Sequence, residues 1–202
     1  MAGSISEIKS SITFGGGLAR TNKFLVSLPS LGAGGIVGFL GSRNMNVLCR
    51  TAQLPGKQIL THEKRIGMKF EKVAYGYAVD DVTLTFLETA TLPVRRYFDT
   101  WRELTVGEDT QRAKYKTEYQ KRILIHQLAQ PVPIAALPIA NRIPADVQVT
   151  TYAVELINAF PTTVTPIDFT NELDGFAETT VSISYTNWKR VPAGQLSFSI
   201  NF

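Results

Sequence analysis

Two hydrophobic periods meet between residues 79 and 104. Apolar side chains alternate with polar ones at Val82, Leu84 and Phe86, and this spacing of two predicts a strand with one buried face. The spacing then changes to three and four, which predicts an amphipathic helix. The residues expected on the packed face of that helix are Val94, Tyr97, Phe98, Trp101 and Leu104.

The ends of this helix carry local signals. Thr91 has a side chain suited to an N-cap, and Pro93 lies in the first turn, where a helix tolerates proline. Gly107 follows the last periodic residue and is suited to ending the helix. No second helical pattern has comparable strength, so the rest of the chain is expected to be β structure.

Other apolar runs predict further strands joined by turns. Such a set of mostly antiparallel strands is typical of a barrel or of two packed sheets. The sequence therefore predicts a mainly β protein: an antiparallel β-barrel or sandwich with one flanking amphipathic helix, in a single domain over residues 1–202. The strands are expected at 23–28, 47–52, 121–128, 152–156, 181–185 and 196–202, and a hairpin is expected within 57–78.

Three segments fit neither period. Residues 1–22 are polar, contain three consecutive glycines and predict an N-terminal arm. Residues 29–46 are glycine-rich, and residues 130–146 contain four prolines, too many for the interior of a sheet. Loops of this length inside a compact domain are often functional, so both are predicted to extend toward other subunits.

Composition is that of a globular chain. The 202 residues are 44% hydrophobic and 19% charged, enough to bury one core. The single cysteine, Cys49, excludes an internal disulfide and fits a reducing compartment. No secretory leader and no apolar run long enough to cross a membrane are found in the sequence, so a soluble protein made in the cytoplasm is expected.

The net charge of +4 is unevenly distributed. Residues 143–188 contain no lysine or arginine, whereas residues 57–72 contain four lysines and one arginine. Opposite charges on one chain allow copies to meet head to tail, although two solvated faces would give the same pattern. The basic residues are Lys57, Lys64, Arg65, Lys69 and Lys72, and the acidic residues are Asp168, Glu172, Asp174 and Glu178.

The residues that usually carry catalysis do not form a recognisable set. His62 lies in a basic polar stretch and His126 in a predicted strand, and neither is accompanied by a nucleophile motif. Cys49 also falls in a predicted strand, where a buried thiol is the simpler interpretation. We therefore expect no catalytic site.

Motifs for cofactors and metals are also incomplete. Asp80 and Asp81 lack the surrounding spacing of a calcium loop. Glycines 15–17 lack the lysine and hydroxyl residue of a phosphate loop, and the glycines within 32–41 precede no helix of a nucleotide-binding unit. The sequence predicts no cofactor and no metal site.

A single-stranded nucleic-acid-binding module is the main alternative of another class. The basic segment 57–72 is accompanied by Phe70, Tyr75 and Tyr77, which offer rings for base stacking on a β surface. The acidic second half would repel phosphates, and +4 is modest for that function.

Five segments stand out together, in chain order: 21–28 (TNKFLVSL), 49–56 (CRTAQLPG), 82–101 with its Phe-x-x-Trp, 159–167 (AFPTTVTPI) and 181–188 (VSISYTNW). Together they resemble one family, the tail tube proteins of contractile, T4-like bacteriophages and their baseplate tube-initiator relatives. Loops 29–46 and 130–146 are longer than expected for a plain tube subunit, and the tail 189–202 adds a strand.

The resemblance implies hexameric rings that stack into the hollow inner tube of a contractile tail. The implied partners are sister copies, tail sheath and baseplate proteins, and phage DNA that passes through the lumen without specific binding. The implied location is the virion tail, after assembly in the host cytoplasm, and a baseplate tube initiator of the same fold remains an alternative. A basic lumen would retain phosphates, so the acidic residues are expected at the lumen or a stacking interface and the basic ones at a ring or stacking interface.

Overall fold

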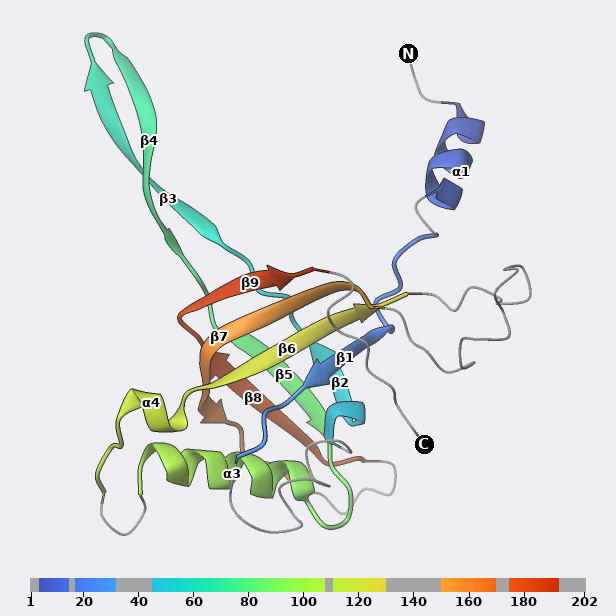
Figure 1. Ribbon diagram of the computed structural model, residues 1–202, viewed down its shortest axis with the longest axis vertical. Helices are drawn as coiled ribbons and strands as arrows, with labels where there is room; N and C mark the ends of the chain where they lie inside the picture. The colour runs from blue at the N-terminus through green and yellow to red at the C-terminus, as the bar shows by residue number, and fades with distance from the viewer. Residues whose placement is uncertain are drawn as a thin grey trace. The chain divides into compact units, whose positions relative to one another are not determined.

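The computed structural model describes residues 4–14, 17–31, 45–107, 111–129, 150–169 and 175–192 (Figure 1). Strands dominate these residues, and the pairs β2–β5, β5–β8, β7–β8 and β3–β4 are antiparallel, which confirms the predicted mainly β class. The helices are α1 (Ile5–Phe14), α3 (Pro93–Thr105) and α4 (Lys116–Tyr119). The strands are β1 (Phe24–Ser27), β2 (Cys49–Ala52), β3 (Gln58–Ile66), β4 (Lys69–Ala78), β5 (Val82–Leu87), β6 (Lys121–Leu128), β7 (Thr150–Val164), β8 (Glu178–Ser184) and β9 (Asn187–Val191).

The chain divides into two compact units. One comprises residues 1–25, 126–153 and 190–202, and the other comprises residues 26–125 and 154–189. The second unit contains α3, the β3–β4 hairpin and the strands β2, β5 and β8. The prediction of a single domain over residues 1–202 stays a prediction.

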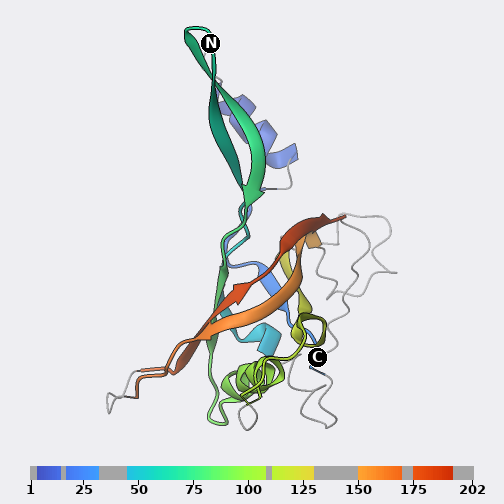
Figure 2. The ribbon, with the colours of Figure 1, turned by 90° about the vertical axis from the view of Figure 1, so that its left-hand side faces the viewer.

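The strands form two sheets. Six follow the order β1-β6-β7-β8-β5-β2, with β9 pairing to β7, so β1 and β2 end the described sheet. Among the described strands, β3 and β4 pair only with each other, and they form a two-stranded ribbon that projects away from β2, β5 and β8 of the same unit (Figures 1 and 2). The predicted hairpin within 57–78 is therefore confirmed.

The core of the second unit follows from strict alternation in β5 and β8. Val82, Leu84 and Phe86 are buried on one face of β5, as the period of two predicts. Helix α3 packs on this face: the centroids of the Phe86 and Phe98 rings lie 5.7 Å apart. Val94, Phe98 and Trp101 are fully buried, and Tyr97 and Leu104 are half-buried.

The start of α3 differs from the prediction. Leu92, not Thr91, is the N-cap, and it adopts the left-handed conformation with φ 48°. The following Pro93 disfavours a right-handed helical backbone at Leu92, which explains why the helix begins one residue later. The helix ends at Thr105 with Val106 as C-cap, two residues before the predicted Gly107.

Helix α1 lies within the predicted arm and was not expected from the apolar period. Ser4 precedes the helix and caps its first turn: its backbone N–H donates to Glu7 Oε2 at 2.9 Å, and its hydroxyl oxygen accepts from the Ser6 backbone N–H at 3.3 Å. Ile5 and Ile8 are exposed, 73% and 55% respectively. The described helices include none that is long and apolar enough to cross a membrane.

The strands and loops predicted at 47–52, 196–202, 29–46 and 130–146 differ from the structure or lie outside the described residues. The strand expected from Val47 begins at Cys49, because residues 45–47 form a helical turn closed by the Leu48 N–H donating to the Met45 carbonyl. The expected strand 196–202 lies outside the described residues, as do most of loop 29–46 and all of loop 130–146.

Candidate assembly surfaces

The β3–β4 hairpin is exposed along almost its whole length. Only Leu60 and Ala78 are half-buried, and every other residue of the two strands is exposed. Its turn requires Gly67, which has φ +64°. An isolated two-stranded ribbon is marginally stable in water, so this hairpin is suited to being covered by another surface.

The large apolar side chains of the hairpin are unusually exposed for a protein surface in contact with water. Met68 at the tip is 96% exposed, Phe70 69% and Tyr77 54%. Strand alternation and register place Ile59, Phe70 and Tyr77 on one face of the ribbon. A row of exposed large apolar side chains of this kind marks an interaction surface.

The hairpin gathers the predicted basic residues but distributes them over both faces. Lys64 and Lys69 lie on one face, and Arg65 and Lys72 lie on the other. Glu71 lies directly opposite Lys64, and Glu63 lies directly opposite Lys72. Neither face is therefore a continuous cationic surface.

The base of the hairpin is tied to the start of β9. The ammonium of Lys57 lies 5.0 Å from the centroid of the Tyr77 ring and 4.9 Å from that of Trp188. The Trp188 indole N–H donates to the Gly56 carbonyl at 3.0 Å, and the Asn187 amide donates to the Tyr77 hydroxyl at 3.2 Å. We call Lys57, Tyr77 and Trp188 the base clamp.

A shallow pocket of about 410 Å³ lies beside this base, lined by residues 53–56 and 80–82. It contains the carboxylates of Asp80 and Asp81, the pair considered for a cation. Across the described residues, no group of three or more histidine, cysteine or acidic side chains is arranged to hold a metal ion.

The face of β5 and β8 opposite the core carries hydroxyl groups. Thr85 lies opposite Thr180, with their hydroxyl oxygens 3.2 Å apart, and Thr83 lies opposite Ser182. The row continues onto β2 and β7 through pairings to Thr85 and Ser182. We call this surface the hydroxyl face; its residues are Thr51, Thr83, Thr85, Thr163, Thr180 and Ser182.

The hydroxyl face was not predicted, although a signal for it is present in the sequence. The alternation that marks the core of β5 and β8 also places Thr83, Thr85, Thr180 and Ser182 on the other side. By itself, this alternation predicts only that these side chains lie on the polar side of each strand. Their alignment into rows depends on strand register, which the sequence does not specify.

The predicted acidic residues do not form one cluster among the described residues. Asp168 is exposed, and Glu178 forms an ion pair with Arg50 at the hydroxyl face. Glu172 and Asp174 lie outside the described residues. The exposed side chains of Phe169 and Phe176 lie on either side of that gap.

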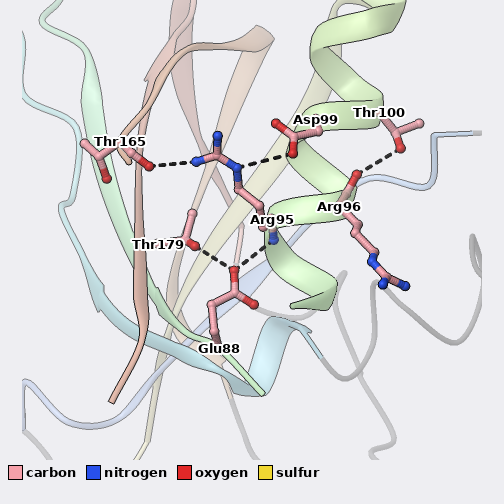
Figure 3. Close-up of polar contacts among 7 residues, drawn as sticks. All are labelled: Glu88, Arg95, Arg96, Asp99, Thr100, Thr165 and Thr179. Carbon is pink, nitrogen blue, oxygen red and sulfur yellow. Dashed lines mark hydrogen bonds and ion pairs between the residues drawn. The ribbon is translucent and has the colours of Figure 1, made fainter. Parts of the chain in front are cut away.

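A partly buried polar network joins α3 to the sheet (Figure 3). Glu88 Oε1 accepts from the Arg95 backbone N–H at 2.8 Å and from the Thr179 hydroxyl at 2.6 Å. The Arg95 guanidinium donates to Asp99 Oδ2 at 3.2 Å and to the Thr165 carbonyl at 2.8 Å. The network holds the first turn of α3 against the sheet.

The histidines and the cysteine are separated. His62 is exposed on the hairpin, 5.8 Å from the Tyr75 ring, whereas His126 is buried in β6, where desolvation lowers its pKa. Burial raises the pKa of the Cys49 thiol to about 12, although a hydrogen bond with the backbone of Thr51 opposes this shift. A thiol with such a pKa is a poor nucleophile at neutral pH.

Comparison with known proteins gives one family and one fold. A family model described as phage tail tube protein matches residues 19–191. No curated protein matches the sequence.

Three solved structures show how widely the fold is shared. A chain of the anti-feeding prophage (AFP) baseplate has a TM-score of 0.56 and 12% identity, covering 89% of this chain and 98% of that chain. A chain of the AFP tube-terminating cap has a TM-score of 0.57 and 14% identity, covering 87% and 92%. A chain of the PVC sheath-tube complex, from an extracellular contractile injection system, has a TM-score of 0.51 and 15% identity, covering 94% and 99%.

Proposed function

The chain belongs to the phage tail tube protein family, and we propose that it assembles into hexameric rings that stack to form the inner tube of a contractile tail. The observation that carries this proposal is the family match over residues 19–191. The tube serves as a conduit for DNA, and its partners are the tail sheath and the baseplate. The protein is a structural component of the virion tail, assembled in the host cytoplasm, and no catalytic step is assigned to it.

The sheet supports ring formation through its ends. Strands β1 and β2 end the described order and are four residues long each. An end strand carries backbone donors and acceptors along its outer side, which pair readily with a strand of another chain. Pairing of these ends between copies would join the sheets of a ring into one cylinder.

The β3–β4 hairpin supports stacking. It exposes Phe70 and Tyr77 on a ribbon that projects from the sheet (Figure 2). Contact with a copy in the next hexamer would remove these aromatic side chains from water. This burial stabilises the contact by about 25 cal/mol per Å² of apolar area covered. Basic side chains on the same ribbon are attracted to acidic residues of that copy, including Asp168.

The hydroxyl face is suited to the lumen. Helix α3 covers the opposite face of β5 and β8, whereas no described helix of this unit covers the hydroxyl face. The side without a helix takes less room, so it fits the narrower inner circumference of a ring. Its hydroxyl groups are neutral, and the charge of Glu178 is balanced by Arg50. Such a wall does not retain a polyanion, because binding of phosphates requires unpaired cations.

The two alternatives are less well supported. The family model describes tube proteins, which favours the main tube over a tube initiator. A nucleic-acid-binding hairpin would need an uninterrupted cationic face, whereas Glu63 and Glu71 lie opposite lysines.

Electron microscopy and sedimentation of the purified full chain test the proposal. The expected result is six-fold rings with a central hole, and stacks of them at higher concentration. A monomer at every concentration, or a monomer that binds single-stranded DNA at physiological salt, would contradict it.

A further inference from the structure

We propose that the base clamp of Lys57, Tyr77 and Trp188 is a positioning device, which holds the β3–β4 hairpin in one direction so that its exposed side chains meet a neighbouring copy already aligned. This inference rests on the proposed function, because alignment matters only if the hairpin contacts another subunit. Within the clamp, Lys57 and Trp188 are predicted to act on assembly without touching the partner themselves, whereas the Tyr77 ring also belongs to the exposed surface of the hairpin.

The clamp joins three separate parts of the second unit. Lys57 immediately precedes β3, Tyr77 lies near the end of β4, and Trp188 lies in β9. The Lys57 ammonium lies within 5.0 Å of both ring centroids, so one cation is shared by two aromatic faces. Both distances are within the range of a favourable cation–π contact.

Two hydrogen bonds reinforce this arrangement at its sides. The indole N–H of Trp188 donates to the carbonyl of Gly56, the residue before Lys57. The amide of Asn187 donates to the hydroxyl of Tyr77. The segment that leads into β3 is thus tied to β9 by one hydrogen bond and one cation–π contact, and β4 is tied to β9 by one hydrogen bond.

The hairpin has little else to hold its direction. Its strands are exposed beyond the base, and β3 and β4 pair with no other described strand. A register shift between Leu60 and Thr61 leaves Tyr75 as an extra residue near the base, and such bulges bend a ribbon. A ribbon bent at its base and otherwise free would sweep through many directions, and fixing it in advance lowers the entropic cost of association.

The indole protons of the two tryptophans provide a direct test in the unassembled full-length subunit. The Trp188 indole N–H belongs to the clamp, whereas the Trp101 indole N–H donates to the Tyr119 carbonyl in the core and serves as an internal reference. Lys57→Gln should speed hydrogen exchange of the Trp188 indole by about two- to fivefold, the equivalent of one exposed cation–π contact. The Trp101 indole should be unaffected.

Matched variants separate charge from structure. Lys57→Arg keeps a cation between the rings and should restore slow exchange at Trp188. Lys72→Gln removes the same charge from the hairpin outside the clamp and should leave that exchange unchanged. Equal exchange in Lys57→Gln and the native protein would overturn the clamp.

Assembly is measured separately on the same variants. Lys57→Gln should raise the concentration at which rings stack, and Lys57→Arg should return it toward the native value. Faster indole exchange with an unchanged stacking concentration would overturn the positioning role. A native chain that never assembles would overturn the proposed function and the positioning role together, while the exchange result still decides whether the clamp exists.

Discussion

At the scale of single residues, the Glu88 carboxylate links α3 to the sheet. One of its carboxylate oxygens accepts from the first turn of the helix and from β8, whereas Oε2 is buried with no hydrogen-bond partner among the described residues. The Arg95 N–H lies in the first helical turn, where amide groups lack partners inside the helix. A carboxylate there is also favoured by the helix dipole.

Removing this carboxylate should destabilise the subunit. Glu88→Ala is expected to lower the free energy of unfolding by about 1–3 kcal/mol, because it leaves buried donors unpaired. Glu88→Gln retains an acceptor and should cost less. Urea denaturation followed by circular dichroism measures both, and Glu103→Ala on the exposed side of α3 serves as the control, with a change within about 0.5 kcal/mol.

His126 predicts a dependence of stability on pH. Its pKa in the folded protein is lowered by burial, so the unfolded chain binds the proton more readily. The contribution of the neutral His126 side chain to the free energy of unfolding is fully present above the unfolded pKa of 6.5. It is lost as the pH falls through the lower pKa of the folded protein. Unfolding free energies measured at several pH values should show this loss in the native protein and a smaller one in His126→Phe.

At the scale of elements, helix α3 and the β3–β4 hairpin differ in where their aromatic side chains are buried. Helix α3 buries Phe98 and Trp101 completely within its own subunit. The hairpin leaves Phe70 69% exposed in the same subunit. Substitution of a phenylalanine in each element should therefore affect different measurements.

Phe98→Ala is expected to lower the free energy of unfolding by about 3–5 kcal/mol, because a cavity replaces a core ring. Phe70→Ser should change it by no more than about 0.5 kcal/mol, as a surface substitution does. Stacking measured by sedimentation should nevertheless weaken in Phe70→Ser. A Phe70→Ser variant that stacks like the native chain would show that this ring lies outside the interface.

The elements also show what the sequence can specify. The period of three and four that predicted α3 is strong because its buried face is wide, and the dense run of apolar residues in β6 located residues 121–128 correctly. Helix α1 lacks a partner face, so only its Ser4-x-x-Glu7 cap could have indicated it. The base clamp was beyond prediction, because it brings Lys57 to Trp188 through folding rather than through neighbouring positions in the chain.

At the scale of the whole molecule, the assignment of the hydroxyl face to the lumen can be tested by chemical labelling. In a Cys49→Ala background, Thr163→Cys places an exposed thiol on the hydroxyl face, and Arg96→Cys places one on α3. In assembled tubes, a maleimide on a long polymer should label Thr163→Cys far more slowly than in free subunits. N-ethylmaleimide, which can diffuse along a lumen, should still label it.

The α3 variant is the control for access from outside. Arg96→Cys should react with both reagents in tubes if α3 lies on the outer side. Rapid reaction of Thr163→Cys with the polymer reagent in tubes would assign the hydroxyl face to the exterior. Loss of reaction with both reagents would assign it to a contact between subunits.

If the hydroxyl face lines the lumen as proposed, the pairing of Arg50 with Glu178 decides how that wall interacts with charged molecules. Where charges cancel beside rows of hydroxyl groups, a polyanion experiences little net attraction or repulsion. A wall of this kind does not select molecules by their charge. Selection would then fall to whatever opens and closes the two ends of the tube.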